Sequence, residues 1–121
     1  MEPRKRSEEI ITFNVVERAY YYTIEFELIT GVIEPAELKV VRVPLITDGG
    51  KGVILSGRGP IWLYGMMIHQ FHPTAWVATM DKRTGPVVVE SHIRGIRTGD
   101  IIDHNLTDPE FWSAVFAQGR N

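Results

Sequence analysis

The chain has 121 residues and a mass of 13.8 kDa, with 44% hydrophobic and 23% charged residues. These values are typical of one globular domain and exclude a disordered, collagen-like or coiled-coil chain. The formal net charge of -2 provides no overall basic field for duplex DNA. The absence of cysteine excludes disulfides, thiolate metal sites and cysteine nucleophiles, which fits a reducing compartment.

We expect no targeting or membrane signal at the start of the chain. Residues 1–9 are charged, no apolar stretch of signal-peptide type follows them directly, and no apolar run reaches the roughly 20 residues that cross a bilayer. We therefore predict a cytoplasmic protein with no membrane partner and one domain over residues 1–121. Residues 1–9 are expected to be a flexible tail, with its basic triplet at residues 4–6 solvated.

The first half of the chain predicts strands. Residues 11–17 and 22–28 alternate apolar and polar side chains, which indicates two antiparallel strands with one solvated face. Pro35 favours a turn or short helix over residues 34–38, and the β-branched run at residues 40–43 predicts another strand.

A βαβ unit is predicted next. An apolar strand around residues 52–55 leads through a glycine-rich turn into a helix over residues 60–71, with Pro60 at its first position, and then into a strand over residues 75–81. The helix is apolar on nearly every side. It should therefore be buried between the sheet and another surface, for which a partner subunit is a good candidate.

The remaining elements complete an α/β fold with a mixed sheet. A hairpin leads into a strand over residues 86–92, and its Val87-Val88-Val89 run predicts burial on both faces. Residues 99–103 are expected to form a short edge strand. Asp108 as cap and Pro109 at the first position predict a C-terminal helix.

Charge and histidine content place any chemistry after residue 50. Residues 51–100 contain six basic and three acidic side chains, and all four histidines lie in the second half of the chain. An anion is therefore expected at the middle of the chain. The Ser56-Gly57-Arg58-Gly59 turn, at a helix start, can offer backbone N–H groups and the arginine fork to a phosphate, although a purely structural tight turn explains it equally well.

His69 and His72 are spaced to share one face for metal binding or proton transfer, whereas histidines at a helix end also cap carbonyls. Asp81 is either a functional carboxylate or the usual aspartate of a hairpin turn. His92 can equally hydrogen-bond a strand terminus, and His104 is assigned no role.

The predicted topology separates these groups. Asp81, Arg83 and the glycine turn share one end of the sheet, while His69, His72 and His92 gather at the other. One subunit can hardly close both groups around one small ligand. Either the strand over residues 75–81 is shorter and more bent than predicted, or the two ends meet across a subunit interface.

Three stretches within residues 51–92 resemble a known family. They read K-G-V-I-L-S-G-R-G-P-I-W-L, H-Q-F-H-P-T-A-W-V-A-T-M-D-K-R and G-P-V-V-V-E-S-H, and they are similar to the CRISPR-associated Csx-three proteins, also called Crn-three ring nucleases. The resemblance implies a small, dimeric, Rossmann-like relative of the CRISPR-associated Rossmann-fold (CARF) sensors. It also implies a cytoplasmic prokaryotic protein of type III CRISPR antiviral defence that binds cyclic tetra-adenylate and cleaves it to linear di-adenylate with the help of Mn(II).

The resemblance also implies roles for individual residues. A hard carboxylate oxygen and imidazoles suit Mn(II), a histidine can act as general acid or base, and an arginine fork can hold a phosphate. The implied catalytic residues are His72, Asp81 and Arg83; the implied ligand-binding residues are Ser56, Gly57, Arg58 and Gly59; and the implied metal ligands are His69, Asp81 and His92.

The family is described as holding the ring nucleotide between two dimers stacked head to tail, which suits two separated ends. We expect one dimer to supply the glycine turn and the other the histidines. Three alternatives stay open: a non-catalytic module that binds cyclic oligoadenylate or an RNA tetranucleotide, a Mn-dependent 3'-exonuclease that shortens RNA tails, and a structural interaction protein whose histidines are caps.

Overall fold

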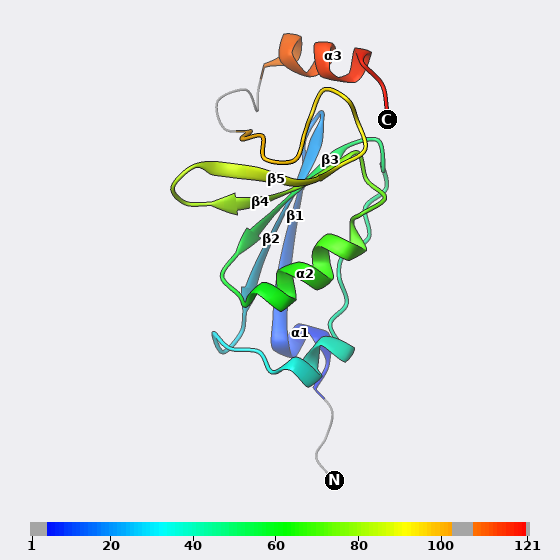
Figure 1. Ribbon diagram of the computed structural model, residues 1–121. Coiled ribbons are helices and arrows are strands. Elements are labelled where there is room, and N and C mark those ends of the chain that lie inside the picture. The colour runs from blue at the N-terminus through cyan, green and yellow to red at the C-terminus, as the bar shows by residue number, and fades with distance from the viewer. Residues whose placement is uncertain (1–4, 103–107, 121) are drawn as a thin grey trace.

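The computed structural model describes residues 5–102 and 108–120, and Figure 1 shows its elements. Five strands form one mixed sheet in the order β1-β2-β3-β4-β5, with helices packed around it. The predicted α/β class is confirmed. The elements are α1 (Ser7–Ile10), β1 (Ile11–Glu17), β2 (Tyr21–Leu28), the 3-10 helix η1 (Pro35–Lys39), β3 (Gly52–Gly57), α2 (Ile61–Gln70), β4 (Trp76–Asp81), β5 (Gly85–Ser91) and α3 (Pro109–Ala117).

The strand directions confirm the predicted βαβ unit. β3 and β4 are parallel and joined by α2, and β2 runs parallel to β3 on its other side. β1 and β5 pair antiparallel at the two edges of the sheet. Because Leu55 pairs with Thr79, the carboxyl ends of β3 and β4 lie at the same end of the sheet.

Each face of the sheet has its own apolar core. On the first face, Ile24, Leu55 and Val77 pack under Leu63 and Met67 of α2, and all five are fully buried. On the second face, α3 covers the sheet at the end where β3 and β4 begin (Figure 1). The second face is left exposed and polar toward the carboxyl ends of β2 and β3, where it carries Thr12, Asn14, Glu25, Glu27 and Ser56.

The strand predicted at residues 40–43 is wrong. This segment follows η1 as irregular chain, and its valines are half-buried because they pack on the first core. The backbone N–H of Arg42 donates to Ser7 Oγ at 2.9 Å instead of a neighbouring strand. The apolar side chains therefore reflect a cover over the core and not a sheet ladder.

Two predictions about β5 and its neighbour also need correction. β5 is an edge strand in which Val88 is buried and Val89 is 37% exposed, so it is not buried on both faces. The expected strand at residues 99–103 is reduced to a single bridge between Val87 and Ile101, and residue 103 lies outside the described residues. The Gly99 N–H donates to the Val88 carbonyl and the Ile102 N–H donates to the Pro86 carbonyl, so the segment lies beside β5 without forming a regular strand.

α2 is not buried on nearly every side in the single chain. Only Leu63 and Met67 are buried in this helix, and Ile61 is 87% exposed. Pro60 is the cap before the helix and not its first residue, because its ψ of 158° is extended.

The two ends of the described chain are ordered by local contacts. Residues 1–4 of the expected tail lie outside the described residues, and residues 7–9 belong to α1 and not to a flexible tail. The C-terminal helix α3 is confirmed, with Asp108 Oδ1 accepting the Glu110 N–H at 3.0 Å. None of the helices in the described segments is long and apolar enough to span a membrane.

Candidate functional site

The sequence-predicted site residues lie in two groups at opposite ends of β4. We call His69, His72, Glu90 and His92 the histidine end, and Ser56 to Gly59 with Asp81 and Arg83 the glycine end. The six residues of β4 separate these ends by roughly 20 Å at about 3.3 Å per residue. The strand directions therefore confirm the predicted separation within one chain.

The histidine end is held together by direct contacts. The His92 backbone N–H donates to the Ala75 carbonyl at 2.9 Å, which fixes this residue beside the start of β4. Its ring Nε2 lies 2.9 Å from the His72 carbonyl, so Nε2 carries a proton and donates it. The two imidazole rings meet edge to face, with centroids 4.7 Å apart. Two residues that are distant in sequence are thus paired before any ligand is present.

Glu90 joins these histidines, and sequence reasoning missed it. Its Oε1 lies 4.0 Å from His72 Nε2 and 3.9 Å from His92 Nε2. One ligand atom from each of the three residues falls within 4.8 Å of the other two. The available signal was the spacing of Glu90 and His92, because residues two apart in an extended segment point to the same side.

The predicted metal ligands are only partly brought together. His69 is exposed and lines a hollow of about 450 Å³ with Gln70, His72 and Pro73, so it lies at the same end as His92. Asp81 lies at the other end of β4. His69, Asp81 and His92 of one chain therefore do not surround one ion, and their joint role as ligands stays a prediction that requires a second copy.

The glycine end is tightly packed. The Tyr64 hydroxyl accepts the Gly57 N–H at 3.1 Å and donates to the Gly57 carbonyl at 2.5 Å, while burial raises the pKa of this tyrosine. A Cβ at Gly57 would lie 2.5 Å from the Phe26 carbonyl oxygen, and one at Gly59 would lie 2.9 Å from Leu63 Cδ2. These contacts support the structural interpretation of the turn, because the Gly57 amide is already engaged.

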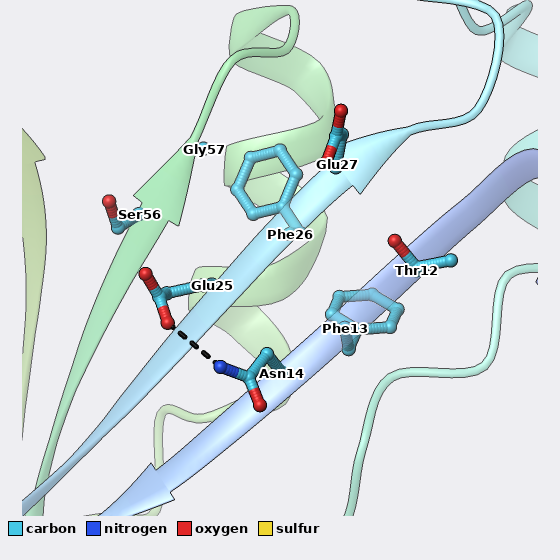
Figure 2. Close-up of a pocket in the computed structure, with 8 residues that line it drawn as sticks. All are labelled: Thr12, Phe13, Asn14, Glu25, Phe26, Glu27, Ser56 and Gly57. Carbon is cyan, nitrogen blue, oxygen red and sulfur yellow. Dashed lines mark hydrogen bonds between the residues drawn. The ribbon is translucent and has the colours of Figure 1, made fainter.

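A hollow of about 410 Å³ lies on the polar sheet face beside this turn, and Figure 2 shows its lining. Ser56 and Gly57 border it on one side, and Asn14 Nδ2 donates to Glu25 Oε1 at 3.0 Å across its floor. The lining contains Glu25 and Glu27 and no basic side chain. Such a surface repels phosphate, so an anion at the glycine end is expected to approach the side of Arg58, which is exposed.

Asp81 serves the hairpin between β4 and β5. Its Oδ1 accepts the Arg83 N–H at 2.7 Å, and this bond is the main cause that lowers the pKa of the carboxyl. The Arg83 Nε lies 3.7 Å from the same oxygen, but its side chain is 88% exposed. Asp81 thus behaves as the turn aspartate of the structural interpretation, while the Arg83 guanidinium extends into solvent.

These features define a small α/β protein with a mixed five-stranded sheet and polar, partly exposed side chains at both ends of its central βαβ unit. Residues 26–103 match the family described as "CRISPR-associated protein (Cas_csx3)". The chain belongs to this CRISPR-associated family, as the resemblance predicted. The match contains both the histidine end and the glycine end, whereas β1 and α3 lie outside it.

A curated relative is similar to about two thirds of the chain. An uncharacterized protein of Aquifex aeolicus (strain VF5) is 44% identical over 86 residues, which are 65% of this chain and 74% of the relative.

Proposed function

We propose that this protein is a ring nuclease that binds cyclic tetra-adenylate and cleaves it to linear di-adenylate, which ends type III CRISPR signalling. Membership of the CRISPR-associated family supports the setting. The observation that carries the catalytic part is the cluster of His72, Glu90 and His92, whose ligand atoms lie within 4.8 Å of one another. The dimer, the relation to Rossmann-fold sensors and the cytoplasmic location belong to the same proposal.

The substrate supplies its own nucleophile. The ribose 2'-OH attacks the adjacent phosphorus, a new O–P bond forms, and the bond to the 5'-oxygen breaks. His72 accepts the proton of the 2'-OH, because its imidazole is 52% exposed and a neutral imidazole has one ring nitrogen that can accept a proton. A water molecule gives a proton to the departing 5'-oxygen, and the resulting hydroxide takes the proton held by His72. Two such cleavages of the ring leave two di-adenylates that each end in a 2',3'-cyclic phosphate. Glu90 stabilises the imidazolium form of His72 from 4.0 Å.

The donor set of the histidine end fits Mn(II), the metal that the family resemblance implies. Imidazole nitrogen and carboxylate oxygen are both ligands that this ion accepts. Glu90 and His92, with His69 from the same end, would hold it, so that His72 stays available as the base, and His92 would first release the His72 carbonyl or present Nδ1. When bound, such an ion polarises a phosphodiester as a Lewis acid.

The glycine end would bind the phosphates of the ring. Arg58 and Arg83 are exposed there and offer planar guanidinium forks that match phosphate oxygens. Because they lie roughly 20 Å from the histidines of their own chain, they would act on a nucleotide whose scissile bond lies at another copy. A homodimer, and dimers stacked head to tail on the ligand, satisfy this requirement.

The test is turnover of labelled cyclic tetra-adenylate by the purified protein with a panel of divalent metals. The wild type should give linear di-adenylate, and His72→Ala should reduce the rate about 10²- to 10⁴-fold, the range for removing a general acid or base. His104→Ala is the matched control and should retain full activity. No product from the wild type with any metal would reject the proposal.

A non-catalytic binding module is the second candidate. It is favoured because two polar atoms of the predicted site already form hydrogen bonds within the fold. The His92 Nε2 and the Asp81 Oδ1 already serve hydrogen bonds of the fold. Tight binding of cyclic tetra-adenylate without product would identify such a module. Faster turnover of linear oligoadenylate than of the ring would instead identify a 3'-exonuclease that shortens RNA tails.

A further inference from the structure

A basic hollow lies where α1 meets the chain that follows η1 (Figure 1). Its volume is about 520 Å³, which falls within the roughly 300–1,000 Å³ typical of small-ligand sites. Lys5 and Arg6 line it from the start of the described chain. Lys39 and Arg42 line it from the end of η1 and the segment after it. Glu8 is the one acidic residue of the described lining, so four basic side chains and one carboxylate give it a formal charge of +3.

The basic hollow is separate from the proposed catalytic site. None of its described lining residues belongs to the histidine end or to the glycine end. Residues 5–8 also precede residue 26, where the match to the CRISPR-associated family begins. Lys5 and Arg6 belong to the basic triplet that we expected to be solvated as part of a tail, and in the fold they line a hollow instead. The proposed function therefore gives these side chains no role.

Hydrogen bonds of the backbone hold the two basic segments in place. The Arg42 N–H donates to Ser7 Oγ at 2.9 Å, which joins the segment after η1 to α1. The Arg6 N–H donates to Glu9 Oε1 at 2.9 Å, which fixes the chain before α1. The basic side chains thus start from fixed backbone positions, and such preorganisation lowers the entropy cost of binding a ligand.

Two of the basic side chains are free to bind an anion. Within the described segments, no carboxylate forms an ion pair with Lys39 or Arg42, and both residues are exposed. An arginine offers a planar fork that matches two oxygens of a phosphate, and a lysine adds a compact positive charge. These two residues can therefore bind phosphate without giving up an existing partner.

The other two basic side chains have partners that are easily replaced. Lys5 Nζ lies 3.3 Å from Glu37 Oε2, and Arg6 Nε lies 3.4 Å from Glu8 Oε1. The Arg6 side chain is 76% exposed, and ion pairs in such surroundings contribute little to stability. A phosphate group can take the place of either carboxylate at small cost.

We propose that the basic hollow binds a small anion with two or three linked phosphate groups, either free polyphosphate or the phosphate tail of a nucleotide. Basic side chains from two segments match an anion whose charge is spread over several phosphates. The half-buried Val40 and Val41 of the lining offer apolar surface to a nucleoside. The carboxylates of Glu8, Glu9 and Glu37 lie beside the basic residues, so the surface does not continue as the basic track that a long nucleic-acid strand requires.

The test is calorimetric titration of the full chain with inorganic triphosphate and with ATP, in buffer without divalent metal. The wild type should show saturable binding that weakens as salt is added. Lys39→Gln/Arg42→Gln should weaken it by about 10-fold or more, because two charged hydrogen-bond donors are lost. Tighter binding of ATP than of triphosphate supports a nucleotide as the source, and equal affinities support the polyphosphate chain alone.

The matched control is Arg18→Gln/Lys82→Gln, which removes the same charge from exposed positions outside the hollow and should bind like the wild type. Circular dichroism checks that the variants are folded, and Arg42→Gln retains the backbone N–H that Ser7 accepts.

Four results would overturn the proposal. They are no saturable binding by the wild type, undiminished binding by Lys39→Gln/Arg42→Gln, an equal loss in the control variant, and tighter binding of a single-stranded oligouridine through the same two residues. Undiminished binding would place the anion elsewhere, and the last result would identify a site for an RNA backbone. Because the titration contains no cyclic nucleotide and the hollow shares no residue with the ring-nuclease site, the outcome is independent of the ring-nuclease assay.

Discussion

The two ends of β4 differ in what their polar groups already do. At the histidine end, His72, Glu90 and His92 contact one another and remain partly exposed, so they form a cluster that can meet a ligand. At the glycine end, the Gly57 amide is engaged by Tyr64 and Asp81 closes a hairpin. The first end is therefore a preformed cluster of partly exposed polar side chains, whereas the polar groups of the second mainly stabilise the fold, and only its two arginines extend into solvent.

The largest expected effect tests whether these unlike ends serve one site. Arg58→Ala and His72→Ala should each lose most of the cleavage of cyclic tetra-adenylate, by about 10²-fold or more for the histidine. Mixing the two proteins should restore part of the activity, because some assemblies then contain one intact composite site. The control mixes His72→Ala with Arg83→Ala/His72→Ala, in which no intact site can form. Absence of rescue, with subunit exchange verified by mass, would show that the site does not combine Arg58 of one copy with His72 of another.

A change at Gly57 tests the packing interpretation of the glycine end. Gly57→Ala forces a Cβ to within 2.5 Å of the Phe26 carbonyl, so the strand must shift, and we expect a loss of about 1 to 3 kcal/mol in the free energy of unfolding. Gly49→Ala has open space and should change stability little. Urea unfolding measures both. Equal stability of the two variants would mean that the glycine serves the ligand and not the fold.

The βαβ unit and the separation of its two ends could be predicted from the sequence, because both depend on the order of elements along the chain. Pro60, Pro73 and the apolar run before the glycine turn delimit the βαβ unit, and strand direction then separates Asp81 from His72. Glu90 was missed because its contact with His72 depends on how β5 returns beside the end of α2, which local pattern does not encode.

Burial of the apolar segments was harder to predict. The valines at residues 40–43 have the same β-branched pattern whether they form a strand or cover a core, and here Arg42 bonds to Ser7 Oγ. The prediction that α2 is buried on nearly every side failed within the single chain for a related reason. Hydrophobic side chains indicate that a helix surface is covered, but they do not indicate which molecule covers it.

Glu90→Gln tests whether the negative charge of Glu90 matters at the histidine end, and we expect an effect of moderate size. The amide keeps the shape of the side chain but removes the negative charge 4.0 Å from His72 and 3.9 Å from His92. Without that charge the cluster is a weaker set of ligands for a cation, so it should bind Mn(II) less tightly than the wild type does. Broadening of the histidine ring-proton NMR signals by Mn(II) measures this affinity, with Glu110→Gln in α3 as control. Equal broadening in the variant and the wild type would show that Glu90 does not contribute to a metal site.

The smallest expected effect is the change with pH in the stability that the Asp81 carboxylate contributes. The Arg83 N–H lowers the folded-state pKa of this carboxyl, so its ionised form contributes stability at pH values above the ordinary aspartate pKa, and this contribution disappears as the pH falls through the lowered value. Asp81→Asn should therefore be slightly less stable than the wild type at neutral pH and equal to it in strong acid, as measured by urea unfolding at both. Lys82→Gln, in the same hairpin, should show one stability difference at both pH values. A constant deficit of Asp81→Asn across the pH range would instead indicate that the carboxylate charge contributes nothing and that the loss comes from altered turn geometry.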